Sequence, residues 1–169
     1  MAEEIVNRVA QSALVTFNLE DYYAKGARKE LDIKDWLFEG FILREKEFRQ
    51  QVKEYNWEQY QDAYVALGCS TDAIIPGWAY MLIATALQPV AKDYCIGSLE
   101  DLETSLYKKA LESLDVSSFK DKPVIIKGCS NKPVPPNAYI WATAKLQAVA
   151  KSIMYGEACS AVPLFKKRK

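Results

Sequence analysis

Three of the four cysteines share a motif, and thiols are the most reactive side chains that this sequence offers. Cys69, Cys129 and Cys159 are each followed by serine, although only ten of the 169 residues are serine. The fourth cysteine, Cys95, lies inside a predicted strand, where a free cysteine behaves as a small hydrophobic residue. The three Cys-Ser motifs are therefore the candidates for chemistry.

A metal site is the first interpretation of these motifs. Thiolates are soft ligands that select zinc or iron–sulfur species over magnesium or calcium. A tetrahedral zinc site needs a fourth donor, and the chain has no histidine, so this donor would be a carboxylate, a water or a group from a partner. Asp72 follows Cys69 by three residues, and Glu157 precedes Cys159 by two. The predicted ligands for zinc or an iron–sulfur species are Cys69, Cys129, Cys159, Asp72 and Glu157.

Three other interpretations of the thiols stay open. Free cysteine is often part of a buried core, and no pair here has the C-x-x-C spacing typical of zinc sites. A second interpretation makes one thiol a sulfur carrier or the nucleophile of a sulfurtransferase. A third is a non-catalytic module that binds another protein through a charged helix or a sheet edge. Whether the chain is an enzyme is therefore open at this point.

Composition excludes several classes of function. Lys and Arg number 22, Asp and Glu also number 22, and half of the residues are apolar, as in an ordinary soluble domain. Without histidine, the Ser-His-Asp and Cys-His catalytic arrangements are excluded. Four basic residues at 166–169 of a neutral chain do not predict nucleic-acid binding.

The start of the chain and its longest charge-free run predict a cytoplasmic protein without a membrane span. The first residues are acidic, whereas a secretory signal has basic residues before an apolar run. Residues 73–91 carry no charge and reach the length of a span. Pro76, Gly77 and Pro89 interrupt this run, so a buried helix is the better interpretation. In a reducing cytosol the cysteines would be free thiols or metal ligands.

A repeat places two of the Cys-Ser motifs at equivalent positions. Residues 63–97 and 123–156 each contain a short apolar run, Gly-Cys-Ser, a proline-containing loop, Ala-Tyr and Leu-Gln-x-Val-Ala-Lys. Each copy has the pattern of strand, loop, helix and strand, with Cys69 and Cys129 just past the first strand. Sites in α/β folds commonly form where strands end, so we expect these two thiols to face the same edge of one sheet.

The rest of the pattern supplies the elements around these loops. Predicted helices begin near Gly77, near Pro136 and after Ser98, where Ser98-x-x-Asp101 resembles a capping box. The helix after Ser98 should end at about Leu114. Residues 22–30 are predicted as a loop, and residues 32–61 as largely helical with a break at Gly40. Predicted strands cover 13–19, 65–67, 94–96, 124–126, 153–155 and 161–165.

These elements predict an α/β fold with a small mixed sheet and helices, built around an internal duplication of a strand–loop–helix–strand unit. We predict a single domain over residues 1–169. Its parts are a strand and helical region at 1–61, a first copy at 62–97, a connecting helix at 98–122 and a second copy at 123–169. A homodimer could complete a metal site with ligands from two chains.

Several runs across nearly the whole chain resemble domain-of-unknown-function family 2480, a bacterial family without an established activity. The runs are DIKDWL at 32–37, LREK at 43–46, CSTDAI at 69–74 with WAY at 78–80, IKGCS at 126–130 with KPVP at 132–135, and SIMYGE at 152–157 with CS at 159–160. The resemblance implies an association with sulfur mobilisation for iron–sulfur cluster assembly, because genes of such proteins often lie near that pathway. Iron–sulfur assembly proteins are therefore the expected partners.

Overall fold

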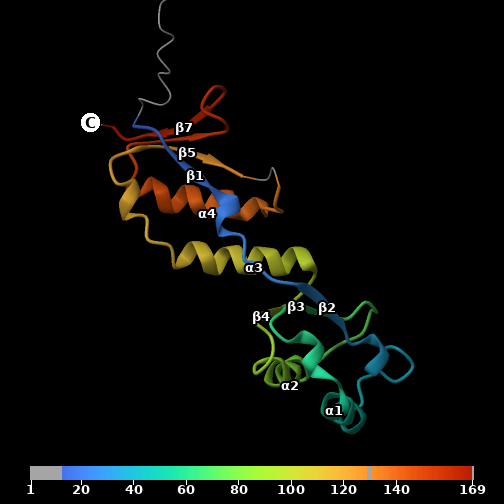
Figure 1. Ribbon diagram of the computed structural model, residues 1–169. Coiled ribbons are helices and arrows are strands. Elements are labelled where there is room, and N and C mark those ends of the chain that lie inside the picture. The colour runs from blue at the N-terminus through green and yellow to red at the C-terminus, as the bar shows by residue number, and fades with distance from the viewer. Residues whose placement is uncertain (1–12, 129–130, 169) are drawn as a thin grey trace, which may run out of the picture. The chain divides into compact units, whose positions relative to one another are not determined.

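The computed structural model describes residues 13–128 and 131–168, which form two compact units (Figure 1). The central unit comprises residues 24–105. The terminal unit combines residues 1–23 with residues 106–169. Each unit has its own sheet and its own buried core, so each is described by itself.

The central unit is built on a parallel sheet of three strands in the order β2-β3-β4. The strands are β2 (Arg28–Asp32), β3 (Tyr64–Gly68) and β4 (Asp93–Ile96). The helix α2 (Gly77–Leu87) connects β3 to β4, and α1 (Glu45–Glu54) lies between β2 and β3 in the chain. Two short 3-10 helices, at Lys34–Trp36 and Trp57–Tyr60, flank α1. Parallel neighbours need such crossover connections.

One face of this sheet packs against both helices. Val65 and Leu67 of β3 form a core with Phe48 of α1 and Ile83 of α2, and all four side chains are buried. Aromatic rings extend this core, because Trp36 meets Phe48, Tyr55 and Trp57 edge to face at centroid distances of 4.9–6.2 Å. Such edge-to-face pairs add to the stability that burial provides.

The helix α3 (Leu99–Glu112) follows β4 and contributes residues to both units. Within the central unit, Glu103 of α3 forms an ion pair with Arg28 of β2, and both side chains are largely buried. The Arg28 guanidinium binds both Glu103 oxygens and donates to the carbonyls of Ala24 and Gly26. The buried carboxylate of Glu103 is therefore fully paired, as its burial requires.

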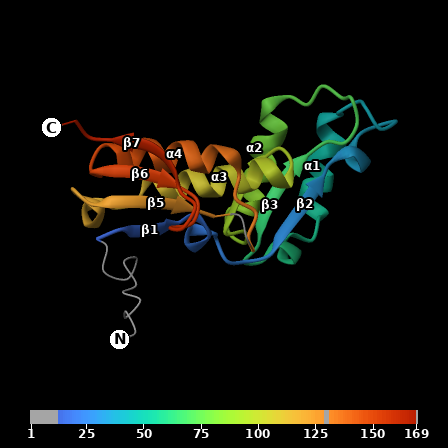
Figure 2. The same ribbon diagram turned by 90° about the horizontal axis from the view of Figure 1, so that it is seen from above.

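The terminal unit is built on a mixed sheet of four strands in the order β1-β5-β6-β7 (Figure 2). The strands are β1 (Val15–Asn18), β5 (Pro123–Lys127), β6 (Ser152–Tyr155) and β7 (Val162–Lys166). The first three are parallel, and β7 is antiparallel to β6. The helix α4 (Pro136–Gln147) connects β5 to β6, and 3-10 helices lie at Leu19–Tyr22 and Ser117–Phe119. Buried residues of the sheet, α3 and α4 form one core, which includes Phe17, Tyr107, Ile126, Ala142 and Leu146.

The predicted α/β class is confirmed, and so are most of the elements inside the two copies. The strands are divided between two sheets, however, rather than joined in one. The predicted loop at 22–30 is wrong in part because β2 begins at Arg28. The helical prediction for 32–61 holds for α1, while residues 38–42 form a tight turn in which Glu39 and Gly40 both have positive φ. The internal duplication and the single domain stay predictions.

Candidate functional site

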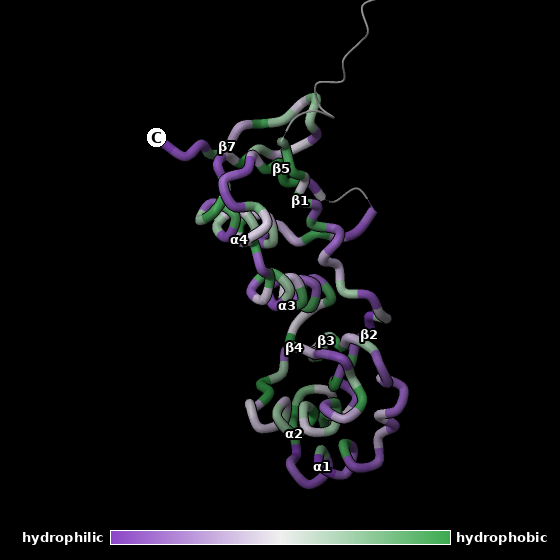
Figure 3. Tube along the Cα trace, turned by 60° about the vertical axis from the view of Figure 1, so that its left-hand side comes forward, coloured by the Kyte–Doolittle hydropathy of each residue, from purple (hydrophilic) through white to green (hydrophobic). Residues whose placement is uncertain are grey.

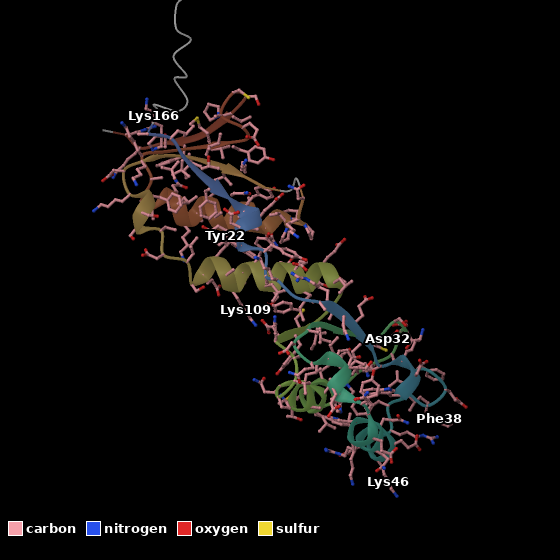
Figure 4. The ribbon with its side chains drawn as sticks, in the orientation of Figure 1. Tyr22, Asp32, Phe38, Lys46, Lys109 and Lys166 are labelled. Atoms are coloured by element: carbon pink, nitrogen blue, oxygen red, sulfur yellow. The ribbon has the colours of Figure 1, made fainter. Side chains whose placement is uncertain are left out.

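The carboxyl ends of the three central strands meet around a pocket of about 460 Å³. Parallel strands end at the same edge of a sheet, so the loops after β2, β3 and β4 converge there. These loops bring Asp32, Cys69 and Ser98 to one place, and α2 adds Tyr80. Figure 4 shows Asp32 at the end of β2. The other lining residues are Glu30, Leu31, Ala66, Gly68, Ser70, Ile96 and Gly97.

Cys69 is the thiol of this pocket, and its position follows from the end of β3 at Gly68. The side chain is half-buried, and Sγ lies 3.3 Å from the Thr71 hydroxyl. That hydroxyl donates its single proton to the Gly40 carbonyl at 2.8 Å. Because a hydroxyl has one proton, the Cys69 thiol must be the donor in its contact with Thr71. Thr71 therefore links the thiol to the turn at 38–42.

Asp32 supplies a carboxylate to the same pocket. Its Oδ1 accepts hydrogen bonds from the backbone N–H groups of Ser70 and Lys34, each at 3.1 Å. Loss of water alone would raise the pKa of Asp32, but hydrogen bonds from Ser70 and Lys34 and the charge of Lys34 outweigh it and lower the pKa. Hydrogen bonds to a carboxylate favour its charged form. Asp32 is thus an ionised acceptor on the pocket wall.

Tyr80 supplies a hydroxyl to the pocket from the first turn of α2. Burial raises the pKa of Tyr80, and the nearby Cys69 raises it further, because both effects disfavour a charged phenolate. The phenol therefore keeps its proton and can donate a hydrogen bond beside the thiol.

Ser98 closes the pocket at the start of α3, and the predicted capping box is confirmed. The Asp101 carboxylate accepts from the Ser98 N–H at 2.7 Å and from the Ser98 hydroxyl at 2.9 Å, and the Asp101 N–H donates back to Ser98 Oγ. Gly97 precedes this cap with φ of +134°, and a Cβ there would clash with Asp101. Only glycine fits this turn without strain.

The five predicted metal ligands are distributed over both units. Cys69 lies in the carboxyl-edge pocket, whereas Asp72 lines a neighbouring pocket with Phe41, Ile42 and Ile74. In the terminal unit Glu157 pairs with Lys127 at 3.7 Å, and Cys159 is exposed. Cys129 lies outside the described residues. Within 13–128 and 131–168, no group of three or more Cys, Asp or Glu residues is arranged to hold a metal ion.

The expectation that the strands preceding Cys69 and Cys129 belong to one sheet is wrong. Cys69 follows β3, which belongs to the three-stranded sheet, whereas Cys129 follows β5, which belongs to the four-stranded sheet. The two equivalent Cys-Ser motifs of the sequence therefore follow strands that belong to two separate sheets. Cys95 lies inside β4 as predicted, and it is half-buried rather than fully buried.

Two residues of the pocket, Asp32 and Ser98, play no part in the site that the sequence predicts. Asp32 was missed because the charged strand β2 does not alternate clearly between apolar and polar residues. Ser98 is recognisable as a helix cap, but its place beside Cys69 depends on the pairing of β4 with β3. A strand prediction for residues 28–32 would have identified Asp32 alone, whereas Ser98 also requires the pairing of β4 with β3.

Comparison with known proteins gives a family and no further relative. The model of a family described as "Protein of unknown function (DUF2480)" matches residues 3–167. No curated protein and no solved structure matches the chain. Across the part of the chain that the structure describes, no helix combines the length and the apolar character needed to cross a membrane.

Proposed function

The chain belongs to the DUF2480 family, and we propose that its central unit is a sulfur-accepting module in which Cys69 carries a sulfur atom as a persulfide. The observation that carries the proposal is the position of Cys69, which is half-buried in a pocket at the carboxyl edge of a parallel sheet. This edge is where open α/β sheets commonly bind their ligands.

The residues of the pocket favour sulfur exchange over other thiol chemistry. A cysteine that transfers acyl groups needs an adjacent base, usually histidine, and the chain has none. Among the described residues that line the pocket there is no Lys or Arg either. Exchange of sulfur between thiols and disulfides or persulfides needs only a thiol, access and polar support. Tyr80 provides that support as a neutral hydroxyl.

The proposed step balances without an external oxidant. The Cys69 sulfur, after losing its proton to water, attacks the outer sulfur of a persulfide donor R–S–SH. The S–S bond of the donor breaks, its electron pair leaves with R–S⁻, and this thiolate takes up a proton as R–SH. Cys69 then carries the outer sulfur as Cys–S–SH, and a second thiol or an assembly scaffold receives it by the reverse chemistry.

Charge in the pocket selects the donor. Glu30 and Asp32 are acidic lining residues, and Asp32 is held ionised by its hydrogen bonds. Small dianions such as thiosulfate would be repelled by this wall. A cysteine persulfide presented by a partner protein avoids that repulsion, because a protein carries no obligatory charge next to its sulfur. Iron–sulfur assembly proteins of the cytoplasm are the partners that we propose for this donation.

Metal binding is the second proposal, supported by the three Cys-Ser motifs of the sequence. Cys69, Cys129 and Cys159 would hold zinc or an iron–sulfur species, with Asp72 or Glu157 as a further donor. Thiolates are suitable ligands for both species. The two proposals differ in what Cys69 binds, a sulfur atom or a metal, so separate measurements test them.

Mass spectrometry of the full chain tests the sulfur proposal. The Cys159→Ser variant is the background, since exposed Cys159 would otherwise react without selectivity. After treatment with cysteine persulfide we expect the mass of one additional sulfur atom on the peptide that contains Cys69. The additional Cys69→Ser change should abolish this gain, Cys95→Ser should leave it intact, and thiosulfate should load the protein at least about tenfold more slowly.

Other outcomes would contradict each proposal. Sulfur on Cys95 or Cys129 with none on Cys69 would contradict the sulfur proposal. Elemental analysis of anaerobically purified wild type and Cys129→Ser tests the metal proposal. Stoichiometric zinc or iron that the Cys129→Ser variant lacks would favour a metal site, and metal-free wild-type protein would rule out a resident one.

A further inference from the structure

The terminal unit carries an open apolar groove of about 760 Å³ between α4 and the strands β6 and β7. Its exposed apolar side chains are Ile140 at 67%, Leu164 at 52% and Tyr155 at 43% of their full exposure. Val134, Pro136, Tyr139, Thr143, Ala144, Gln147 and Ile126 complete the lining, so none of the described residues that line the groove is charged. A continuous apolar hollow of this kind is typical of an interaction surface.

The central unit carries a separate apolar patch that is exposed to solvent. Phe41, Ile42 and Ile74 line one pocket at the turn 38–42 and the loop after Cys69. Ile74 is 94% exposed, Phe41 54% and Ile42 42%. Removing such side chains from water is favourable. These three residues form the loop patch. Contact with another apolar surface would remove them from water.

The net charge of the chain is zero because its two units carry opposite net charges. The central unit has nine Lys and Arg against 14 Asp and Glu, which gives −5. The terminal unit has 13 Lys and Arg against eight Asp and Glu, which gives +5. Lys166, at the end of β7, is labelled in Figure 4, and the hydrophilic tail after it is visible in Figure 3. Opposite fields of this size attract two copies of a chain to each other.

We propose that two copies of this chain associate head to tail, with the loop patch of one copy seated in the α4–β7 groove of the other. The groove belongs to the basic unit and the patch to the acidic unit, so both hydrophobicity and charge favour the contact. If the pair closes with twofold symmetry, each copy offers one groove and one patch, and the contact forms twice. This inference does not depend on the chemistry of Cys69.

A second copy fits the groove better than an added strand does. The edge strand beside the groove is β7, and Pro163, its second residue, has no N–H to donate to a neighbouring strand. The pairing of β6 with β7 is also irregular between Ile153 and Met154. Irregular, proline-containing edges resist strand addition. Side chains that insert into the groove need no such backbone pairing.

Analytical ultracentrifugation of the full chain tests the proposal. We expect concentration-dependent association at about 0.1 M salt that weakens at about 1 M salt, because the Debye length falls from about 10 Å to about 3 Å. Ile140→Glu in the groove and Ile74→Glu in the loop patch should each raise the apparent dissociation constant by about tenfold or more.

Met81 offers a matched control for Ile140. It occupies the equivalent position of α2, 59 residues earlier, and is 70% exposed, yet it lines neither the groove nor the loop patch. Met81→Glu should therefore leave association unchanged. All three positions are exposed, so the variants should fold, which circular dichroism checks.

A mixture of the two disruptive variants distinguishes a contact between a patch and a groove from a contact between two grooves. Ile140→Glu retains its loop patch and Ile74→Glu retains its groove, so their mixture should associate more tightly than either variant alone. A monomeric wild type at low salt would overturn the proposal. So would an association that Ile74→Glu leaves intact, since the grooves would then meet each other, and so would equal weakening by Met81→Glu.

Discussion

The central and terminal units contain the same crossover of strand, helix and parallel strand, and they differ in the connection that leaves the second strand. In the central unit α3 begins directly after Gly97, and Ser98 and Asp101 place polar groups at the carboxyl edge. In the terminal unit the chain turns after Gly156 and returns as β7, which adds Leu164 beside α4. One edge becomes a polar pocket with a thiol, and the other becomes an apolar groove.

This difference teaches that the connection after a crossover, and not the crossover itself, decides which side chains line the edge of the sheet. Tyr80 and Tyr139 occupy equivalent places in α2 and α4, and both line their pocket. In the central unit the tyrosine lines a pocket with Cys69 and an ionised Asp32, whereas in the terminal unit it contacts Tyr155 at a ring distance of 5.8 Å. The same helix position therefore lies beside a thiol in one unit and beside an aromatic ring in the other.

Matched core deletions in the two units should have the largest effect on stability. Leu87 of α2 and Leu146 of α4 are equivalent and fully buried, so each change to Ala should cost about 3–4 kcal/mol of unfolding free energy. Because α3 contributes to both units, we expect one cooperative urea transition that shifts to lower urea in both variants. Two separate transitions, each moved by only one variant, would contradict the single domain that the sequence predicts.

Loss of the buried ion pair should have the next largest effect. Glu103→Ala would leave the Arg28 guanidinium largely buried without its carboxylate, at a cost of about 2–3 kcal/mol. The control lies on the same helix, where exposed Glu112 is 3.9 Å from Lys108. Glu112→Ala should change the unfolding free energy by less than about 0.5 kcal/mol, because exposed pairs are screened by water. Equal effects in urea unfolding would show that burial does not distinguish the two pairs.

Most helices and strands of the two units could be predicted from the sequence, because the residue patterns that mark them are local. Apolar runs bounded by glycine and proline mark β3, β5, α2 and α4, and the cap at Ser98 marks α3. Their type does not depend on distant partners. The expected position of Cys69 just beyond a buried strand is confirmed for the same reason.

The rest could not be predicted because it depends on tertiary pairing. The strand β2 has only Leu31 fully buried among charged residues, and it is a strand because it pairs with β3 along its length. Without β2, Asp32 has no place in the pocket. Nor does a sequence repeat state whether its two copies share a sheet, and the sheets here are separate. The predicted metal site, with Cys69 and Cys129 as ligands, assumed that the two copies share one sheet.

Acid titration should show the smallest and most specific difference between the units. Asp101 in the central unit and Asp115 in the terminal unit each accept hydrogen bonds from a serine N–H and hydroxyl, Ser98 and Ser117 respectively, at 2.7–2.9 Å. The backbone hydrogen bond, followed by that of the hydroxyl, lowers the pKa of each aspartate below its usual value. Exposed Asp72 provides the control, and both aspartates can be changed to Asn.

The sign of the effect follows from these lowered pKa values. A carboxylate with a lower pKa in the folded state stabilises the fold above its unfolded pKa of about 3.9, and this stability is lost as the pH falls through the folded pKa. Asp101→Asn should therefore lower the urea midpoint at pH 7, and the gap from wild type should close below about pH 4. Asp115→Asn should do the same more weakly, because Asp101 caps the 14-residue α3 and Asp115 precedes a 3-10 helix of three residues. A gap that persists at low pH, or one equally large for Asp72→Asn, would mean that these carboxylates act through something other than their hydrogen bonds to serine.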